Sequence, residues 1–262
     1  MERTLLVVST ICFLFGFAYS MYSLGARVYH PSWMNLVAIL TGFAFQTAFL
    51  MERGREVHRC PLTNTFEVLV FLCWSMVIFY LAIGTAYRLS LLGAFTSPLV
   101  FVIQAAALLI ETPPVVAPGP LNPWLELHAA LSILAYGAFA LACVAGAMYL
   151  AQERQLKTHH IHSVFYHLPP IRDLAVANRR LVLAGFILLT VGLVAGWMHG
   201  PGHIVVMRLI SIGIWLLYGF VVGAAMRGGI SPRRVAWLSV TAFAVMLATL
   251  WGMQFVPATH AA

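Results

Sequence analysis

Charged residues are scarce in this chain of 262 residues: they make up 9% of it, whereas hydrophobic residues make up 61%. A soluble protein needs more charge on its surface, so this composition excludes a soluble globular protein and predicts a polytopic membrane protein. Basic residues of membrane proteins mostly mark cytoplasmic loops and meet anionic lipid, so the net charge of +7 does not indicate nucleic-acid binding. We expect the lipid bilayer, and no nucleic acid, as a partner.

Cysteine is also rare, and the sequence motifs of several enzyme classes are missing. The four cysteines form no CxxC pair, and three of them lie inside apolar runs, where a small buried side chain is the ordinary interpretation. The chain has no phosphate-binding glycine loop, zinc-protease pattern or nucleophile-elbow serine.

Long apolar runs are what the chain does contain. A helix needs about 20 mainly apolar residues to cross the hydrocarbon core, and eight segments qualify. The runs do not alternate with a period of two, so strands are not predicted. We predict an all-α, single integral-membrane helical bundle over residues 1–262, with eight transmembrane helices. The segments are residues 5–24, 34–51, 66–87, 89–110, 127–151, 180–200, 204–226 and 233–255.

Lysine and arginine are unevenly divided between the two sides of such a bundle. The side reached after the first, third, fifth and seventh segments carries ten of the 15, and the side with both termini carries five. The positive-inside rule places the richer side in the cytoplasm, so we predict that both termini are external, that is, periplasmic. Residues 152–180 then form the largest cytoplasmic loop, and the proline-rich residues 111–126 form an irregular external loop.

Histidines lie at the ends of the apolar segments on both sides. A neutral imidazole ligates haem iron well, and two histidines on opposite porphyrin faces fill both axial positions. Interfacial histidines are also ordinary, and five of the ten lie on each side, so the pattern alone leaves both interpretations open. A metal site is the less favoured interpretation of the four cytoplasmic histidines, because Asp173 is the only nearby carboxylate. The external five are His58, His128, His199, His203 and His260.

The segment His58–Trp74, with the sequence HRCPLTNTFEVLVFLCW, resembles the cytochrome c assembly family of CcsA, HemX and YpjD-type proteins. That family has a Pro-Leu-(Ser/Thr)-Asn-x-(Tyr/Phe)-Glu pattern at this place. Later segments are similar in the same order, namely Leu92–Leu99, Leu127–Tyr136 and Met148–Lys157, with a weaker match at Gly185–Gly192. The resemblance covers residues 55–256, a cytochrome c assembly-like region.

The resemblance implies a multi-pass protein of the bacterial inner (cell) membrane that serves cytochrome c biogenesis. It would bind or deliver haem at the outer face as an assembly subunit rather than as an enzyme. His128 matches the external haem ligand of haem-handling members, and His260, after the last helix, resembles a second ligand loosely. The implied partners are a second, CcsB-like assembly protein of the membrane and apocytochrome c.

One segment departs from the family pattern. The family carries a tryptophan-rich segment ending in Trp-Asp-Pro-Lys, whereas the corresponding Trp197–Arg208 lacks the aspartate and most of the tryptophans. His199 and His203 could substitute there as ligands. The departure favours an alternative, a HemX-like membrane regulatory or scaffold protein of tetrapyrrole synthesis without haem-ligating activity. A permease would need polar residues deep in its helices, and Gln46 and Gln104 are the few mid-helix amides.

Four further external residues are candidates for the same site. Trp124 and Trp251 either belong to an aromatic belt at the interface or stack on a haem. Glu67 either caps the start of its helix or takes a buried position beside a histidine or arginine. Glu126 precedes His128 by two residues and could orient its ring, as carboxylates do for ligating imidazoles.

Overall fold

The computed structural model describes residues 2–25, 33–84, 90–110, 122–158, 170–198, 205–227 and 230–252. Within these ranges the chain forms eight α-helices, one short π-helix and no strand, so the predicted all-α architecture is confirmed. The bounds are α1 Glu2–Gly25, α2 Trp33–Val57, α3 Thr65–Phe79, the π-helix η1 Tyr80–Gly84, α4 Ser90–Leu108, α5 Pro123–Thr158, α6 Ile171–Met198, α7 Val205–Met226 and α8 Pro232–Gly252.

Two helix starts are specified by local sequence. Asn64 caps α3, because its Oδ1 accepts from the backbone N–H of Glu67 at 2.9 Å. The Asn122 side chain likewise accepts from the backbone N–H of Trp124 at 3.1 Å, and Pro123 occupies the first helical position of α5. Both choices satisfy or remove N–H groups that a helix start leaves without partners. As a result α5 begins earlier than the predicted residue 127.

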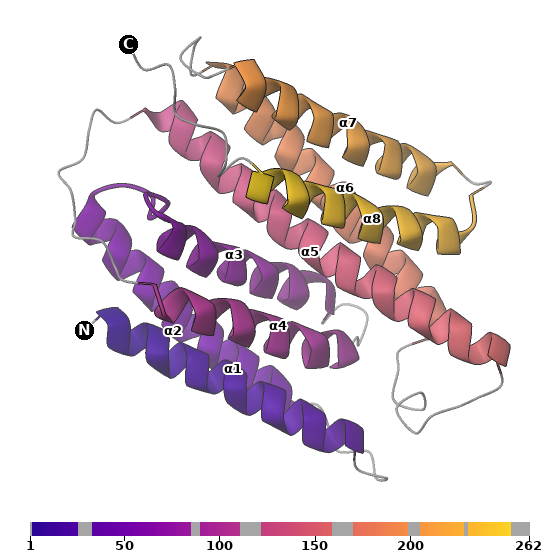
Figure 1. The fold of residues 1–262 in the computed structure, drawn as a ribbon. Coiled ribbons are helices and arrows are strands. Elements are labelled where there is room, and N and C mark those ends of the chain that lie inside the picture. Colours follow the sequence, from indigo (N-terminus) through magenta and orange to yellow (C-terminus); the bar gives the residue numbers. More distant parts are fainter. Residues whose placement is uncertain are drawn as a thin grey trace.

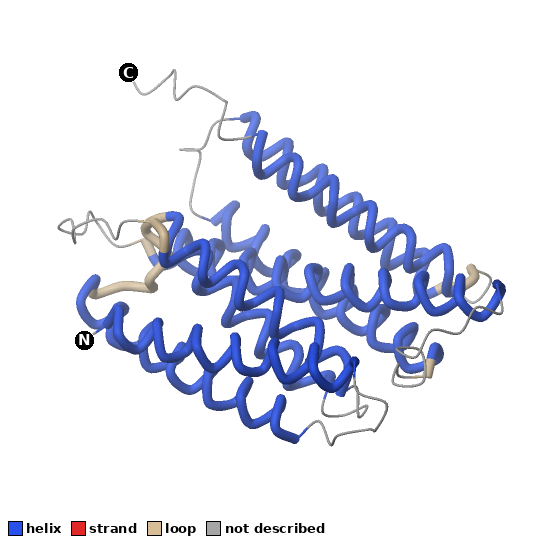
Figure 2. The backbone as a smooth tube through the Cα atoms, turned by 60° about the horizontal axis from the view of Figure 1, so that its bottom comes forward, coloured by secondary structure: helices blue, strands red, loops and turns tan. Residues whose placement is uncertain are grey.

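The helices form two groups, α1–α4 and α5–α8, in which successive helices run antiparallel (Figure 1). The closest packing is between α5 and α6 and between α1 and α2, and α3 joins the groups by packing against α5. The long α5 extends past its neighbours through the middle of the molecule (Figures 1 and 2). We call the end where α5 begins and α6 ends the histidine end. The opposite end, where α6 and α8 begin, is the arginine end.

The predicted loop at residues 152–180 is wrong over most of its length. Helix α5 continues to Thr158 and α6 already begins at Ile171. Hydropathy detects only the apolar part of a helix, whereas this polar extension of α5 is made of good helix formers. It also gains an i,i+4 ion pair, in which Lys157 Nζ donates to Glu153 Oε1 at 2.8 Å.

Six of the described helices are long and apolar enough to cross a membrane, namely α1, α2, α3 with η1, α5, α6 and α7. Helix α4 has a shorter apolar stretch, Leu92–Leu108. The structure therefore confirms a helical bundle of membrane type. The count of eight crossings and the external location of the termini stay predictions.

The two mid-helix amides hold the first helix group together. Both are fully buried, and Gln46 Nε2 donates to Gln104 Oε1 at 2.9 Å and to the carbonyl of Val70 at 3.2 Å. Gln104 Nε2 in turn lies 3.1 Å from Ser9 Oγ and 3.0 Å from Thr10 Oγ1. Hydrogen bonds between buried polar groups fix which helix faces meet, so these amides contribute to the packing of α1, α2, α3 and α4.

Candidate functional site at the histidine end

His128 lies in the second turn of α5 and faces the last turns of α6. Its ring is half-buried, and Nδ1 lies 2.7 Å from the carbonyl oxygen of Gly192. A carbonyl oxygen only accepts hydrogen bonds, so Nδ1 must carry the proton and donate. In the neutral ring this leaves the lone pair on Nε2. Metal-binding histidines typically have this arrangement, with one ring nitrogen donating to a backbone carbonyl and the other free to ligate.

Gly196 of α6 makes room for the imidazole, and Gly192 makes room for the neighbouring backbone and side chains of α5. A Cβ atom on Gly196 would lie 2.8 Å from His128 Nδ1, closer than real Cβ atoms come, and 3.2 Å from its Cγ, which is also a tight contact. A Cβ on Gly192, one turn earlier, would lie 3.2 Å from Leu131 Cβ. The ring therefore rests in a shallow groove on α6 that only glycine leaves open. The small-xxx-small spacing of Gly192 and Gly196 is typical of close helix contacts in membranes and is the signal that sequence reasoning missed.

Glu67 lies at the same end and is fully buried beside Arg53. Arg53 Nε donates to Glu67 Oε1 at 2.8 Å, while the backbone N–H and the hydroxyl of Thr63 both donate to Oε2 at 2.8 Å. Arg53 also reaches the more exposed Glu56 at 3.4 Å. The structure thus contains a capped helix start and a buried carboxylate–arginine pair that ties α2 to α3. A contact of Glu67 with a cofactor stays a prediction.

Glu126 has a different partner from the one expected. Its Oε2 accepts from the backbone N–H of Cys60 at 3.5 Å, so it holds the α2–α3 loop against α5, and the partner of His128 is Gly192. The expectation that Glu126 orients His128 is therefore wrong. Burial raises the pKa of the Cys60 thiol, and the negative charges of Glu126 and Glu67 raise it further. This thiol is protonated at neutral pH and is a poor nucleophile.

His58 directly follows α2 and has a strained backbone conformation. The strain leads to a prediction about stability. His58 is an exposed residue with a positive φ of 53°, where a Cβ is unfavourable. We expect His58→Gly to raise the free energy of unfolding by about 1 kcal/mol, because glycine adopts this φ without steric strain. His58→Ala is the control and should give no gain, because alanine keeps the Cβ. Equal melting temperatures for His58→Gly and His58→Ala in detergent would contradict the explanation.

The remaining candidates are described only in part. Trp124 lies one turn before His128 on the same face of α5, with 40% of its surface exposed. Trp251 lies in the last turn of α8, and its side chain is outside the description. Among the described residues, no group of three or more His, Cys, Asp or Glu side chains converges as a metal site would require. His199, His203 and His260 lie outside the described ranges, as do His159, His160, His162 and His167.

Residues 62–260 match the model of the family described as "Cytochrome C assembly protein". The chain belongs to the cytochrome c assembly protein family. It is 29% identical to the protein HemX of Brevibacillus brevis over 160 residues, which is 60% of this chain and 59% of that protein. It is also similar to two proteins named cytochrome c biogenesis protein CcsA. The match with that of Gloeobacter violaceus is 33% identical over 40% of this chain and 32% of the relative. The match with that of Prochlorococcus marinus subsp. pastoris is 25% identical over 86% of this chain and 81% of the relative.

Two of these relatives are matched over only part of their length. The chain spans 59% of the HemX protein and about a third of the Gloeobacter protein, so neither relative is matched over its whole length. The family match covers α3 to α8 and includes His128 and its α6 groove. The family identification thus applies to the part of the chain in which the imidazole is positioned.

Proposed function

We propose that this chain is a membrane factor of cytochrome c biogenesis that binds or delivers haem at the outer face of the bacterial inner membrane. The observation that carries the proposal is the His128–Gly192 hydrogen bond at 2.7 Å in a member of this family. It fixes the ring and leaves Nε2 as a ligand nitrogen at the edge of the bundle. Ligation by neutral imidazole suits haem iron, so the residues present fit this cargo.

Five other residues take part in the proposed site. Opposite His128, the second axial position would be filled by His260, or by His203 or His199 in the segment after α6. Trp124, one turn from His128, and Trp251 would stack on the porphyrin. In this arrangement the protein positions the haem and holds it in place. The covalent chemistry belongs to the acceptor, an apocytochrome c, and to a second, CcsB-like membrane protein.

The proposed orientation places the histidine end outside. It assumes eight crossings and both termini in the periplasm, which puts the ten lysines and arginines of the other side in the cytoplasm. Haem bound at His128 would then face the compartment in which c-type cytochromes are completed. A reporter fused after residue 262, active only in the periplasm, tests this orientation directly.

Deletion of the gene in the organism that encodes it tests the function. We expect covalently attached cytochrome c haem to be lost and to be restored by the wild-type gene but not by His128→Ala at equal protein level. Haem staining of denaturing gels measures this. Normal c-type cytochromes in the deletion strain, or full rescue by His128→Ala, would refute the proposal.

The second candidate function is a HemX-like regulator or scaffold of tetrapyrrole synthesis that binds no haem. The missing Trp-Asp-Pro-Lys segment between Trp197 and Arg208 and the 29% identity to a HemX protein support it. The same deletion strain separates the two functions. Altered levels of haem precursors together with unchanged cytochrome c would identify the regulator.

A further inference from the structure

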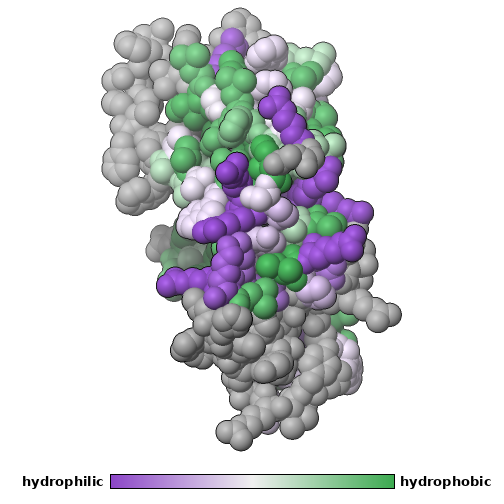
Figure 3. Space-filling view, turned by 90° about the vertical axis from the view of Figure 1, so that its right-hand side faces the viewer, coloured by the Kyte–Doolittle hydropathy of each residue, from purple (hydrophilic) through white to green (hydrophobic). Residues whose placement is uncertain are grey.

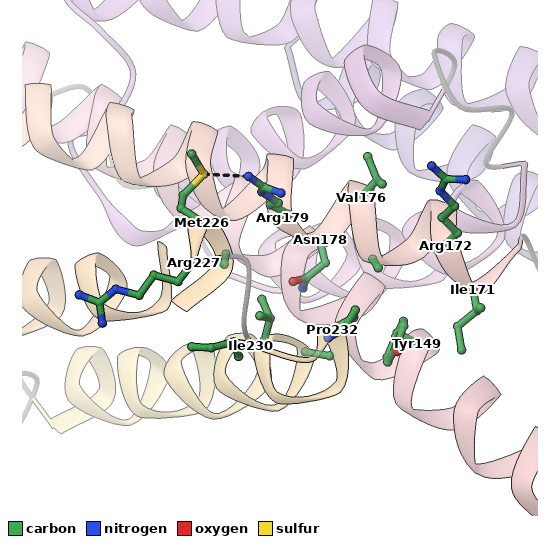
Figure 4. Close-up of a pocket in the computed structure, with 14 residues that line it drawn as sticks. Tyr149, Ile171, Arg172, Val176, Asn178, Arg179, Met226, Arg227, Ile230 and Pro232 are labelled. Atoms are coloured by element: carbon green, nitrogen blue, oxygen red, sulfur yellow. Dashed lines mark hydrogen bonds between the residues drawn. The ribbon is translucent and has the colours of Figure 1, made fainter. Parts of the chain in front are cut away.

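A second candidate site lies at the arginine end, on the opposite side of the bundle from His128. Here α5, the start of α6, the end of α7 and the start of α8 line an open-sided cavity of about 530 Å³ (Figure 4). Apolar side chains form much of its wall, among them Ile171, Val176, Met226, Ile230 and Val235. A cavity of this size is in the range of small-molecule pockets.

Three arginines line this cavity. Arg172 and Arg179 lie two turns apart on one face of α6, and Arg227 directly follows α7 (Figure 4). None of them forms a salt bridge with another described residue. Arg179 Nη2 donates to Met226 Sδ at 3.2 Å, and a thioether sulfur is a weak acceptor. Neighbouring Arg233, in contrast, pairs with Glu153 at 3.4 Å. The three guanidinium groups therefore keep their capacity to bind an anion.

The rest of the arginine end cannot neutralise them. Among the residues that the structure describes, Glu153 and Asp173 are the only acidic ones at this end, against eight lysines and arginines. Glu153 already contacts Lys157 and Arg233, and neither acid lines the cavity. Seen from this side, hydrophilic side chains form a band across the middle, with apolar side chains above it (Figure 3). The cavity thus combines an uncompensated positive charge with an apolar wall.

We propose that this cavity binds an anionic phospholipid, with the headgroup at the rim lined by Arg172, Arg179 and Arg227 and the first part of the acyl chains on the apolar wall. The three guanidinium groups point in different directions, so their positive charge is spread around the rim and does not converge on one phosphate (Figure 4). Guanidinium groups match phosphate oxygens in geometry and charge. Basic pockets between helix ends at a membrane surface are suited to such headgroups. The site is independent of the haem ligand, because it lies at the other end of the bundle.

Native mass spectrometry of the full chain in detergent tests this site, with phosphatidylglycerol and phosphatidylcholine of equal acyl chains as probes. We expect the wild type to retain one phosphatidylglycerol and to prefer it over phosphatidylcholine. The triple variant Arg172→Gln/Arg179→Gln/Arg227→Gln should lower that preference by at least about ten-fold. The control Arg154→Gln/Arg180→Gln/Arg234→Gln removes the same charge at the same end, outside this cavity. It should change the preference by less than about two-fold, because none of these three side chains lines the cavity.

A cavity-filling variant keeps the charges and tests the apolar wall. Ala175→Phe places a ring in the cavity, so we expect it to displace phosphatidylglycerol although all three arginines remain. Four results would overturn the proposal: equal losses in the two triple variants, equal retention of phosphatidylcholine, displacement of the lipid by inorganic phosphate, or displacement by protoporphyrin at equal concentration. Circular dichroism of each variant confirms that the helices are kept.

Discussion

Replacing His128 by alanine is expected to abolish the Soret band that the full chain develops when it is titrated with haem in detergent. Loss of an orienting partner alone typically costs about 10–100-fold in metal affinity, so loss of the ligand itself should cost more. His58→Ala is a suitable control, because it removes an exposed imidazole at the same end of the bundle. If His128→Ala gave a Soret band of the same intensity with the same haem affinity, His128 would not be the ligand.

Gly196→Ala tests whether the α6 groove positions that ligand. The new Cβ would lie 2.8 Å from His128 Nδ1, so the ring must move and its hydrogen bond to Gly192 must weaken. We expect haem affinity to fall by about 10–100-fold although His128 is still present. Gly213→Ala is the matched control, because a Cβ at Gly213 has no atom within 4 Å. Equal affinities for Gly196→Ala and Gly213→Ala would mean that the groove does not position the ring.

The second large effect is expected from Glu67→Ala, which should lower the free energy of unfolding by about 3–5 kcal/mol. The physical reason is that Arg53, with only 7% of its side chain exposed, would lose the carboxylate at 2.8 Å and keep a buried charge. Thr63 would also lose the acceptor of two hydrogen bonds. In a chain of this size the melting temperature should fall by roughly 10 °C. A fluorescence-detected thermal melt of the detergent-solubilised protein measures this.

Glu56→Ala provides the internal control for that experiment. It removes the other carboxylate near Arg53, at 3.4 Å, but the Glu56 side chain is 47% exposed. Exposed ion pairs contribute little, so we expect a loss below about 1 kcal/mol. If both variants melted at the same temperature, the buried pair would not be what stabilises the α2–α3 junction.

Helix α5 shows which parts of a helix could be predicted from the sequence. The apolar run predicts its middle. The Asn122-Pro123 pair marks its observed start, which lies before that run. Its polar end to Thr158 was predicted as a loop, because hydropathy measures the preference for lipid and not helix propensity. For Glu67 the sequence leaves two alternatives, helix capping or a buried position beside a histidine or arginine, and nothing in it identifies Arg53 as the partner.

The all-helical class, the eight helices and the family follow from the amino-acid sequence, because low charge, long apolar runs and the segments from His58 onward are local properties of the chain. Only the packing of the helices shows which carbonyl His128 bonds, which arginine Glu67 meets and where three arginines line one cavity. His128 and Gly192 are 64 residues apart, and the cavity is formed by parts of four helices. Such partners depend on which helix faces pack, and small residues such as Gly192 and Gly196 set that packing.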